Sequence, residues 1–366
     1  SVRVTAHRSG YDSLDAASAA TATVTAGSLT PGDVRIGGST AVGKTLTASP
    51  GTWTPAATSF TYQWKADGVA IAGADQADYV PTAAELGKTL SVEVTGHRAG
   101  YTDTTASAVV NGEVVPGTLT AGSASVTGTA AVGRTLVVDP GTWTPSPAFG
   151  YQWYCTTLAG TRGVGDNSPA LTLTADQLGC TISVKVTGSR AGYNDKAITV
   201  GATGAVSVGN LAHGTVWISG TLAVGSVLTA QTGSWDPMPT LSYQWFRGEM
   251  PIDGATAATY TVRSGDVNKT LSVQVTASLA GYEDVTIGAE TDAKISAIAV
   301  TPGTVTLVGS PVVGQTLAVN EGTWSPSGTT FGYRWYRDGE QVATTPAYQL
   351  TAADLGATMS VVVHGT

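Results

Sequence analysis

Bulky apolar residues alternate with small or polar ones over Phe60–Trp64, and the same pattern returns three more times along the chain. A period of two places alternate side chains on opposite faces of a β-strand, so one face of this strand is expected in a core and the other in water. The copies are Phe60-Thr-Tyr-Gln-Trp64, Phe149-Gly-Tyr-Gln-Trp153, Leu241-Ser-Tyr-Gln-Trp245 and Phe331-Gly-Tyr-Arg-Trp335. They predict a structural core at Tyr62, Trp64, Tyr151, Trp153, Tyr243, Trp245, Tyr333 and Trp335.

Other landmarks repeat with the same period. The motif Ser-Val-x-Val starts at Ser1, Ser91, Ser183, Ser272 and Ser360, which are 90, 92, 89 and 88 residues apart. A Gly-Thr/Ser-Trp turn motif ends at Trp53, Trp143, Trp235 and Trp324. A fixed period of this length indicates tandem copies of one unit.

One period contains about seven short alternating segments and no convincing helix, which favours a two-sheet β-sandwich, with a barrel as the open alternative. Strands of this length predict sandwiches roughly 35–45 Å long. Short connectors such as Val115-Pro-Gly-Thr118 predict limited freedom between them and therefore an elongated rod. The expected domains are 1–29 (the last two strands of a preceding repeat), 30–115, 116–206, 207–298, and 299–366 (a repeat lacking its last strand).

The motif set resembles a known family. Val-Gly-x-Thr-Leu, Pro-Gly-Thr-Trp, Tyr-Gln-Trp, Ala-Asp-x-Leu-Gly and Ala-Gly-Tyr look like tandem immunoglobulin-like repeats of secreted and surface proteins of high-GC Gram-positive bacteria. The resemblance covers essentially the whole chain and implies an all-β fold of immunoglobulin-like sandwiches. No cysteine stands on the second strand, so the antibody disulfide is not carried over.

The only two cysteines, Cys155 and Cys180, lie on the inward faces of their segments, two residues after Trp153 and two before Ile182. Antiparallel neighbouring strands of an immunoglobulin-like sheet would bring both to the same end. We expect a disulfide there, with a pair of buried thiols as the alternative. A disulfide suits an extracellular or cell-surface location.

Composition excludes several functions. A net charge of −8, a pI near 4.9 and no basic stripe argue against nucleic acid, and no segment is long and apolar enough to span a membrane. No nucleophile stands in a pattern with a base, so we expect no enzyme and no cofactor. One or two carboxylates after each Gly-Tyr turn are too few for a predicted metal site, although calcium at domain junctions stays open.

Exposed aromatic residues give the best indication of binding. Trp217 stands at a strand position that is polar in the other copies, and Tyr154, Phe246 and Tyr336 follow the core tryptophan and so face outward. Flat rings on a sheet face can stack on a sugar or on a neighbouring chain, and packing against a local loop is the alternative.

The sequence therefore predicts a non-catalytic stalk or fibre segment of a secreted or cell-surface protein, with adhesion as a further expectation. Its expected partners are neighbouring repeats, copies of itself or extracellular glycans. Two alternatives stay open. The repeats could be carbohydrate-binding accessories of a glycan-active enzyme, or the chain could form filaments head to tail, with Ala16–Thr25 of one copy completing the last sandwich of the next. The incomplete ends also fit a segment cropped from a longer array.

Overall fold

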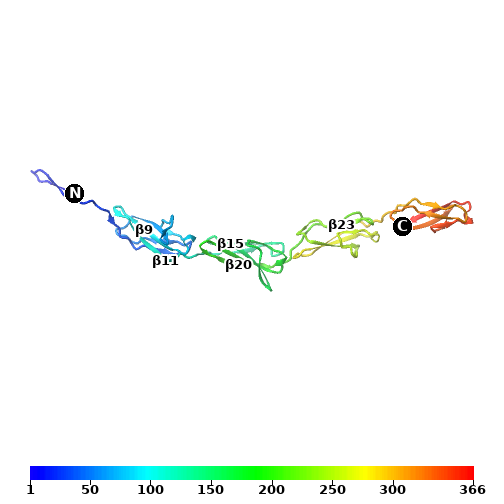
Figure 1. Cartoon of the computed structure of the whole chain (residues 1–366), viewed down its shortest axis with the longest axis horizontal. Coiled ribbons are helices and arrows are strands. Elements are labelled where there is room, and N and C mark those ends of the chain that lie inside the picture. The colour runs from blue at the N-terminus through cyan, green and yellow to red at the C-terminus, as the bar shows by residue number, and fades with distance from the viewer. The chain divides into compact units, whose positions relative to one another are not determined.

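The computed structural model describes the backbone of residues 1–366 and all side chains except those of residues 202 and 203. The chain divides into two compact units, Ser1–Gly209 and Asn210–Thr366. Regular structure is almost entirely β, arranged in many small sheets (Figure 1). The prediction of an all-β fold built from immunoglobulin-like sandwiches is confirmed.

The first complete sandwich has a three-stranded sheet in the order β4-β5-β8 and a four-stranded sheet in the order β11-β9-β6-β7. The bounds are β4 Arg35–Gly38, β5 Leu46–Ser49, β6 Ser59–Ala66, β7 Val69–Ala70, β8 Asp78–Tyr79, β9 Thr89–His97 and β11 Thr104–Glu113. Leu46 and Ala48 of the first sheet pack with Trp64, Val92 and Val94 of the second, and all are buried. The core therefore lies between the sheets, as the alternation requires.

The second sandwich repeats this plan with sheets β13-β14-β17 and β16-β15-β18-β20. The bounds are β13 Ser125–Thr127, β14 Thr135–Asp139, β15 Ala148–Thr157, β16 Gly160–Val164, β17 Ala170–Thr172, β18 Thr181–Ser189 and β20 Lys196–Ala205. Strand β16 was not predicted. It pairs with the aromatic strand β15, which is therefore an inner strand and not an edge strand of its sheet. Two short parallel strand pairs, β3–β10 and β12–β19, join linkers to Gly-Tyr turns. Their bounds are β3 Gly27–Ser28, β10 Tyr101–Thr102, β12 Gly117–Thr118 and β19 Tyr193–Asn194.

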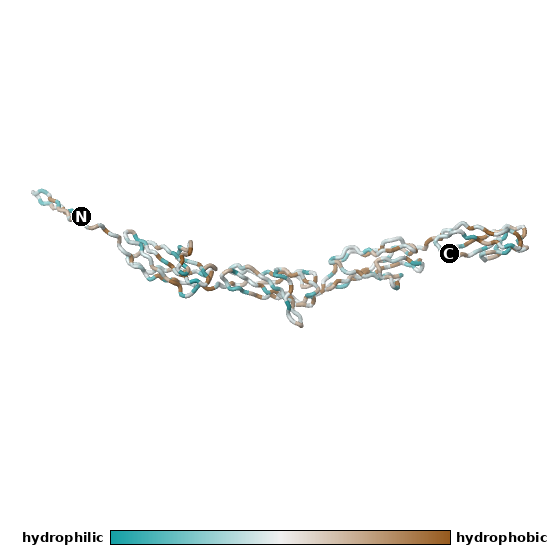
Figure 2. The backbone as a smooth tube through the Cα atoms, viewed as in Figure 1, coloured by the Kyte–Doolittle hydropathy of each residue, from teal (hydrophilic) through white to brown (hydrophobic). Residues whose placement is uncertain are grey.

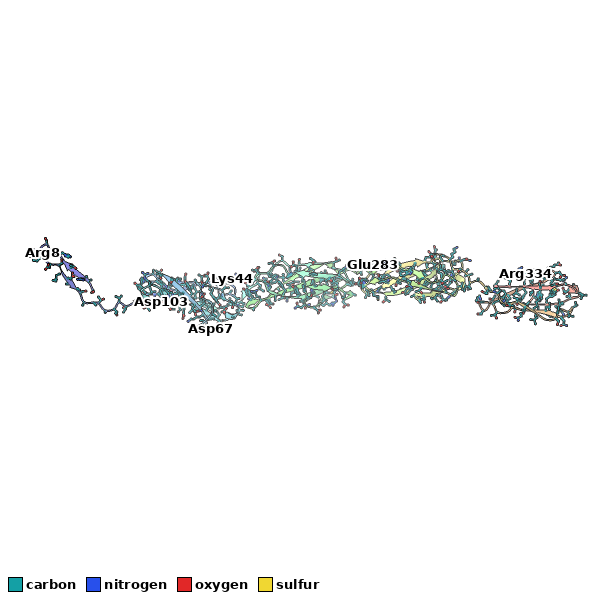
Figure 3. The ribbon with its side chains drawn as sticks, turned by 90° about the horizontal axis from the view of Figure 1, so that it is seen from above. Arg8, Lys44, Asp67, Asp103, Glu283 and Arg334 are labelled. Carbon is teal, nitrogen blue, oxygen red and sulfur yellow. A yellow bond between two sulfur atoms is a disulfide. The ribbon has the colours of Figure 1, made fainter. Side chains whose placement is uncertain are left out.

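The N-terminal 26 residues form a separate element of the first unit. Strands β1 (Arg3–Ala6) and β2 (Leu14–Ala17) pair as an antiparallel hairpin with Arg8 in its turn, labelled in Figure 3. All of these residues are solvent-exposed, so the hairpin has no core of its own.

The second unit contains two further sandwiches. In the first of these the sheets are β22-β23-β27 and β26-β25-β28-β29, and in the second they are β30-β31-β34 and β33-β32-β35. The bounds of the first are β21 Ala212–His213, β22 Trp217–Ser219, β23 Val227–Gln231, β24 Trp235–Asp236, β25 Thr240–Arg247, β26 Met250–Pro251, β27 Thr259–Thr261, β28 Leu271–Ser278 and β29 Val285–Glu290. Those of the second are β30 Thr306–Val308, β31 Thr316–Asn320, β32 Phe331–Arg337, β33 Glu340–Ala343, β34 Ala347–Gln349 and β35 Met359–Gly365. Figure 2 shows polar and apolar residues interspersed along every sandwich.

The turn predicted at Ala175–Gly179 is a single turn of 3₁₀ helix in every repeat. The four turns are η1 Ala83–Glu85, η2 Ala175–Gln177, η3 Ser264–Asp266 and η4 Ala352–Asp354. Each ends on a buried polar residue whose side-chain oxygen accepts a hydrogen bond from the backbone N–H three residues earlier. This closes the turn in the manner of a capping box.

Candidate functional site

The aromatic strand of each repeat separates a structural face from an outer face. Its tryptophan is fully buried in all four copies, at Trp64, Trp153, Trp245 and Trp335. Each indole N–H donates to a backbone carbonyl at 2.8–2.9 Å, so burial leaves this polar atom paired. In three repeats the ring packs on a tyrosine of the opposite sheet, with centroids 5.6–5.8 Å apart. The inner face is therefore filled by protein.

The outer face carries the aromatics that the sequence offered as surface contacts. Tyr154, Phe246 and Tyr336 are half-buried, and each stands directly opposite a serine of the neighbouring strand. In the first sandwich the same position is Lys65, which forms an ion pair with Glu93. The rings lie one per repeat, each on the outer face of its own aromatic strand.

Trp217 lies on the opposite sheet from Phe246, in the edge strand β22. Its side chain is 48% exposed, which agrees with an outward orientation. It borders a hollow of about 580 Å³ that is also lined by Ser219, Glu290 and Asp292. A flat ring beside two carboxylates and a hydroxyl provides one stacking surface and several hydrogen-bond acceptors.

Cys155 and Cys180 are joined by a disulfide in the structure, with Cα atoms 5.3 Å apart and both side chains buried. The bond ties the end of β15 to the residue before β18. The disulfide therefore connects the end of the aromatic strand to the segment that follows the 3₁₀ turn.

The two repeats of the second unit use an ion pair at the same place. Arg247 stands where the second repeat has Cys155, and its Nε donates to Asp266 at 2.6 Å. Asp266 is completely buried and also accepts from the Tyr260 hydroxyl at 2.9 Å. The last repeat has the same three groups as Arg337, Asp354 and Tyr348. The disulfide repeat has a neutral Gln177 at the position of this aspartate, and the first repeat has Glu85 there.

The pKa values of two carboxyl groups at the 3₁₀ turns, Asp354 and Glu85, are lowered, and that of Tyr79 beside Glu85 is raised. Hydrogen bonds from Thr351, first from its backbone N–H and also from its hydroxyl, lower the pKa of Asp354 to about 2 against the opposing effect of burial. Burial opposes ionisation of Glu85 in the first repeat, but hydrogen bonds from Thr82 outweigh it and lower the pKa of that carboxyl. Burial, and then the charge of Glu85, raise the pKa of Tyr79 to about 12. All three groups cap or brace the 3₁₀ turn, which is a structural role.

The Gly-Tyr turn forms the joint between the two sandwiches of the first unit. Tyr193 of the second sandwich packs against the core of the first, over Val42. Its ring leaves no room for a Cβ at Gly43 or Gly117, so both positions require glycine. Arg190 covers the ring from the other side, 5.7 Å from its centroid. The sequence showed the Ala-Gly-Tyr motif but gave no indication that it lies between repeats.

A second feature that sequence reasoning missed is an apolar hollow at the end of the last repeat. It has a volume of about 480 Å³ and is lined by Val312, Val313, Leu350, Leu355 and Met359, among others. Leu355 is 82% exposed and Val312 58% exposed, which is unusual for apolar residues that are adjacent in space.

Among the described side chains, no group of three or more histidine, cysteine, aspartate or glutamate residues is placed to hold a metal ion. The charged residues labelled in Figure 3 come from separate parts of the chain. Near the surface, His97 Nδ1 lies 2.9 Å from the Asp103 carboxylate, and its Nε2 lies 2.9 Å from the Thr61 hydroxyl. No described helix is long and apolar enough to cross a membrane.

No protein-family model matches the chain, and no curated protein matches it significantly. Several solved structures align with it. A Ca²⁺-stabilised adhesin that helps an Antarctic bacterium bind ice is 14% identical over 94% of this chain and 99% of its own, with a TM-score of 0.26. The FN1–FN3 domains of chicken CNTN1 are 14% identical over 73% and 99% (TM-score 0.20), and three N-terminal domains of the bacteriophage RB49 outer capsid protein Hoc are 15% identical over 74% and 100% (TM-score 0.21). With scores this low the likenesses carry no inference about function, and the fold is established by the chain's own sheets.

Proposed function

We propose that the chain is a non-catalytic structural segment of a secreted or cell-surface protein, which holds other modules apart as part of a stalk or fibre. The observation that carries the proposal is the joint at Tyr193. Its ring seats against Val42 and Gly43 of the preceding sandwich, and a parallel strand pair, β12–β19, fixes the linker beside it. A joint that buries an aromatic ring restrains the two sandwiches, which is what a spacer needs.

Two further observations support an extracellular setting. The disulfide Cys155–Cys180 persists in an oxidising compartment, and each sandwich has its own closed or nearly closed core. Because the cores are independent, one repeat of a tandem array can unfold while the others stay folded. The origin in high-GC Gram-positive bacteria that the motif set implies is part of this proposal.

Small-angle X-ray scattering of the dilute full chain tests the spacer role. The proposal predicts a maximum dimension several times that of one sandwich. Tyr193→Ala should broaden the distribution of distances while circular dichroism and the unfolding profile of each repeat stay unchanged. A compact particle in which the repeats fold back on one another would contradict the proposal.

A second candidate function is glycan contact at Trp217, favoured by its 48% exposure beside the hollow that Glu290 and Asp292 line. A polysaccharide panel probed with the full chain and with Trp217→Ala tests it. Val227→Ala is the matched control, because Val227 is 53% exposed on the adjacent strand of the same sheet. Loss of binding in the tryptophan variant alone would support a contact site. Absence of binding, or equal loss in both variants, would reject it.

A further inference from the structure

The polar residue that ends the 3₁₀ turn is buried in all four sandwiches, but its chemical partners differ. It is Glu85, Gln177, Asp266 and Asp354 in chain order, and each is at most 8% exposed. A carboxylate that is removed from water to this extent is costly unless a cation or several hydrogen bonds compensate for it. The groups that surround each of these side chains therefore show how its charge is balanced.

In the third and fourth sandwiches an arginine of the same repeat balances the carboxylate. Arg247 donates from Nε to Oδ1 of Asp266 at 2.6 Å. The other oxygen of this carboxylate accepts from the Tyr260 hydroxyl at 2.9 Å and from the backbone N–H three residues earlier at 2.7 Å. Arg337 donates in the same way to Oδ1 of Asp354, at 2.8 Å. One oxygen therefore caps the turn, and the other accepts from a guanidinium group.

The first sandwich has the carboxylate without the arginine. Ala66 stands at the strand position of Arg247, as the pairing of β6 with β9 and of β25 with β28 shows. Thr82 donates to Oε2 of Glu85 from its backbone N–H at 2.8 Å and from its hydroxyl at 2.7 Å, which caps the turn. No lysine, arginine or histidine among the described side chains forms an ion pair with Glu85. The oxygen that corresponds to the arginine-bound one is therefore not matched by a cation of this repeat.

A hollow of about 340 Å³ opens beside this carboxylate. Its lining includes Glu85, Tyr79, the half-buried Ile71 and the exposed Asp78. Tyr79 stacks on the core tryptophan at a centroid distance of 5.6 Å, and its counterpart in the third sandwich does the same at 5.7 Å. The exposed side of the hollow thus carries a second carboxylate, and its inner side carries the same tyrosine and acid that hold a guanidinium group in the third sandwich.

The nearest cations of the first unit have other roles. Lys88 follows the turn, is exposed and forms no ion pair with Glu85. The third sandwich has a lysine at the same position and still uses its arginine for the buried acid. Arg190 of the second sandwich lies near the other side of the turn, where it donates to the Ser146 carbonyl at 2.7 Å and covers the ring of Tyr193.

We propose that the hollow beside Glu85 binds a guanidinium group from outside the first sandwich, which takes the place that Arg247 fills in the third. The planar guanidinium group donates to the oxygen of Glu85 that Thr82 does not use, and the exposed Asp78 adds attraction at the entrance. An arginine side chain of another polypeptide and a small guanidino compound present the same chemistry. The site goes beyond the spacer role and does not depend on it.

Amide NMR spectra of the full chain, titrated with ethylguanidinium chloride, test the site. Saturable shifts are expected for the amides of residues 71–85. The turns that end at Asp266 and Asp354 should not respond, because their own arginines already fill the site. The turn that ends at Gln177 should not respond, because it carries no charge. Ethylammonium chloride at the same ionic strength is the matched control, and an equal saturable response to it would overturn the proposal.

Glu85→Gln removes the charge and keeps the turn. The second sandwich shows that glutamine fits, because Oε1 of Gln177 accepts from the backbone N–H and the hydroxyl of Thr174 at 2.8 and 2.9 Å. The variant should bind ethylguanidinium at least tenfold more weakly, because a neutral amide replaces the charged acceptor. Asp75→Asn is the matched control. Asp75 is exposed and lies outside the lining of the hollow, so its loss should change the affinity by no more than about twofold.

Exchanging the partners between sandwiches gives a second test. Ala66→Arg combined with Glu85→Asp reproduces the pair of the third sandwich and should abolish the response at residues 71–85. Arg247→Ala should create the same response in the third sandwich, at residues 252–266. If this variant loosens the third sandwich, ethylguanidinium should restore its amide signals, and ethylammonium should not.

The blocked tripeptide Gly-Arg-Gly separates the two sources of the guanidinium group. Saturable shifts with both the tripeptide and ethylguanidinium would assign the site to arginine side chains of a partner, and shifts with ethylguanidinium alone would assign it to small guanidino compounds. Three results would overturn the proposal. They are the absence of saturable shifts with either probe, a response that Glu85→Gln leaves unchanged, and an equal response at the turn that ends at Gln177.

Discussion

The sandwich at 30–115 and the repeat at 299–366 share the aromatic strand, the Gly-Thr-Trp turn and the Ser-Val-x-Val motif but differ in how completely their cores close. The tryptophan of the aromatic strand is fully buried in both, at Trp64 and Trp335. Val42, at the rim of the first sandwich, is 4% exposed, and its counterpart Val313 is 42% exposed. The aromatic strand therefore buries its tryptophan with or without the last strand, whereas the rim around the 3₁₀ turn closes only when that strand is present.

The first test of this comparison replaces the buried tryptophan that the two repeats share. Trp64→Ala should cost about 3–5 kcal/mol and unfold residues 30–115, because a large cavity would open at the centre of one core. The other sandwiches have separate cores and should remain folded. Limited proteolysis with mass spectrometry would locate the loss. Unfolding of the whole chain in one step would show that the repeats are not independent.

The disulfide should have the next largest effect. Replacing both Cys155 and Cys180 by alanine should lower the stability of residues 116–206 by roughly 3 kcal/mol, from the entropy of a loop of 25 residues. Urea unfolding followed by segment-resolved hydrogen exchange would measure it. A reducing agent should reproduce the effect in the unmodified chain and do nothing to the variant. An equal loss in a repeat without cysteines would contradict this.

Val114→Ala should leave the core of the first sandwich incompletely closed, like that of the last repeat. Removing this buried side chain should cost about 1–3 kcal/mol and speed the exchange of the amides of Val92 and Val94. Val115→Ala is the control, because Val115 is 49% exposed and one residue away. Equal effects of the two changes would show that burial of the closing residue is not what matters.

Acid should affect the last repeat through Asp354. Its folded pKa of about 2 lies below the ordinary value of 3.8, so the unfolded state takes up a proton first as pH falls. The stabilisation is therefore complete above about pH 4 and is lost as pH falls towards 2. The pH dependence of unfolding should flatten in this window in Asp354→Asn. An unchanged profile in that variant would assign the acid sensitivity to other carboxyl groups.

The smallest expected effect is that of a substitution on the outer face of the aromatic strand. Tyr154→Ala should change the stability of residues 116–206 by no more than about 1 kcal/mol, because the ring is half-buried beside a serine. Thermal unfolding compared with that of Trp153→Ala would check it. A loss as large as that of the tryptophan variant would move Tyr154 into the structural core.

Much of the fold could be predicted from the sequence because its signals are local and repeated. The alternation at Phe60–Trp64 defined a half-buried strand, and the recurrence of the pattern defined the tandem units. Features that depend on pairing across a repeat could not be predicted. Nothing in the letters Ala-Ala-Asp-Leu-Gly at 352–356 distinguishes an exposed turn from one that buries Asp354 against Arg337. The seat of Tyr193 on a neighbouring sandwich depends on contacts between repeats that a single repeat cannot reveal.

Hydrogen–deuterium exchange of the dilute full chain, with peptides covering β9 and β35, tests the central claim most directly. If the last strand is what closes each sandwich, β9 should be strongly protected and β35 should exchange much faster. Equal protection of β35 and β9 would contradict the claim.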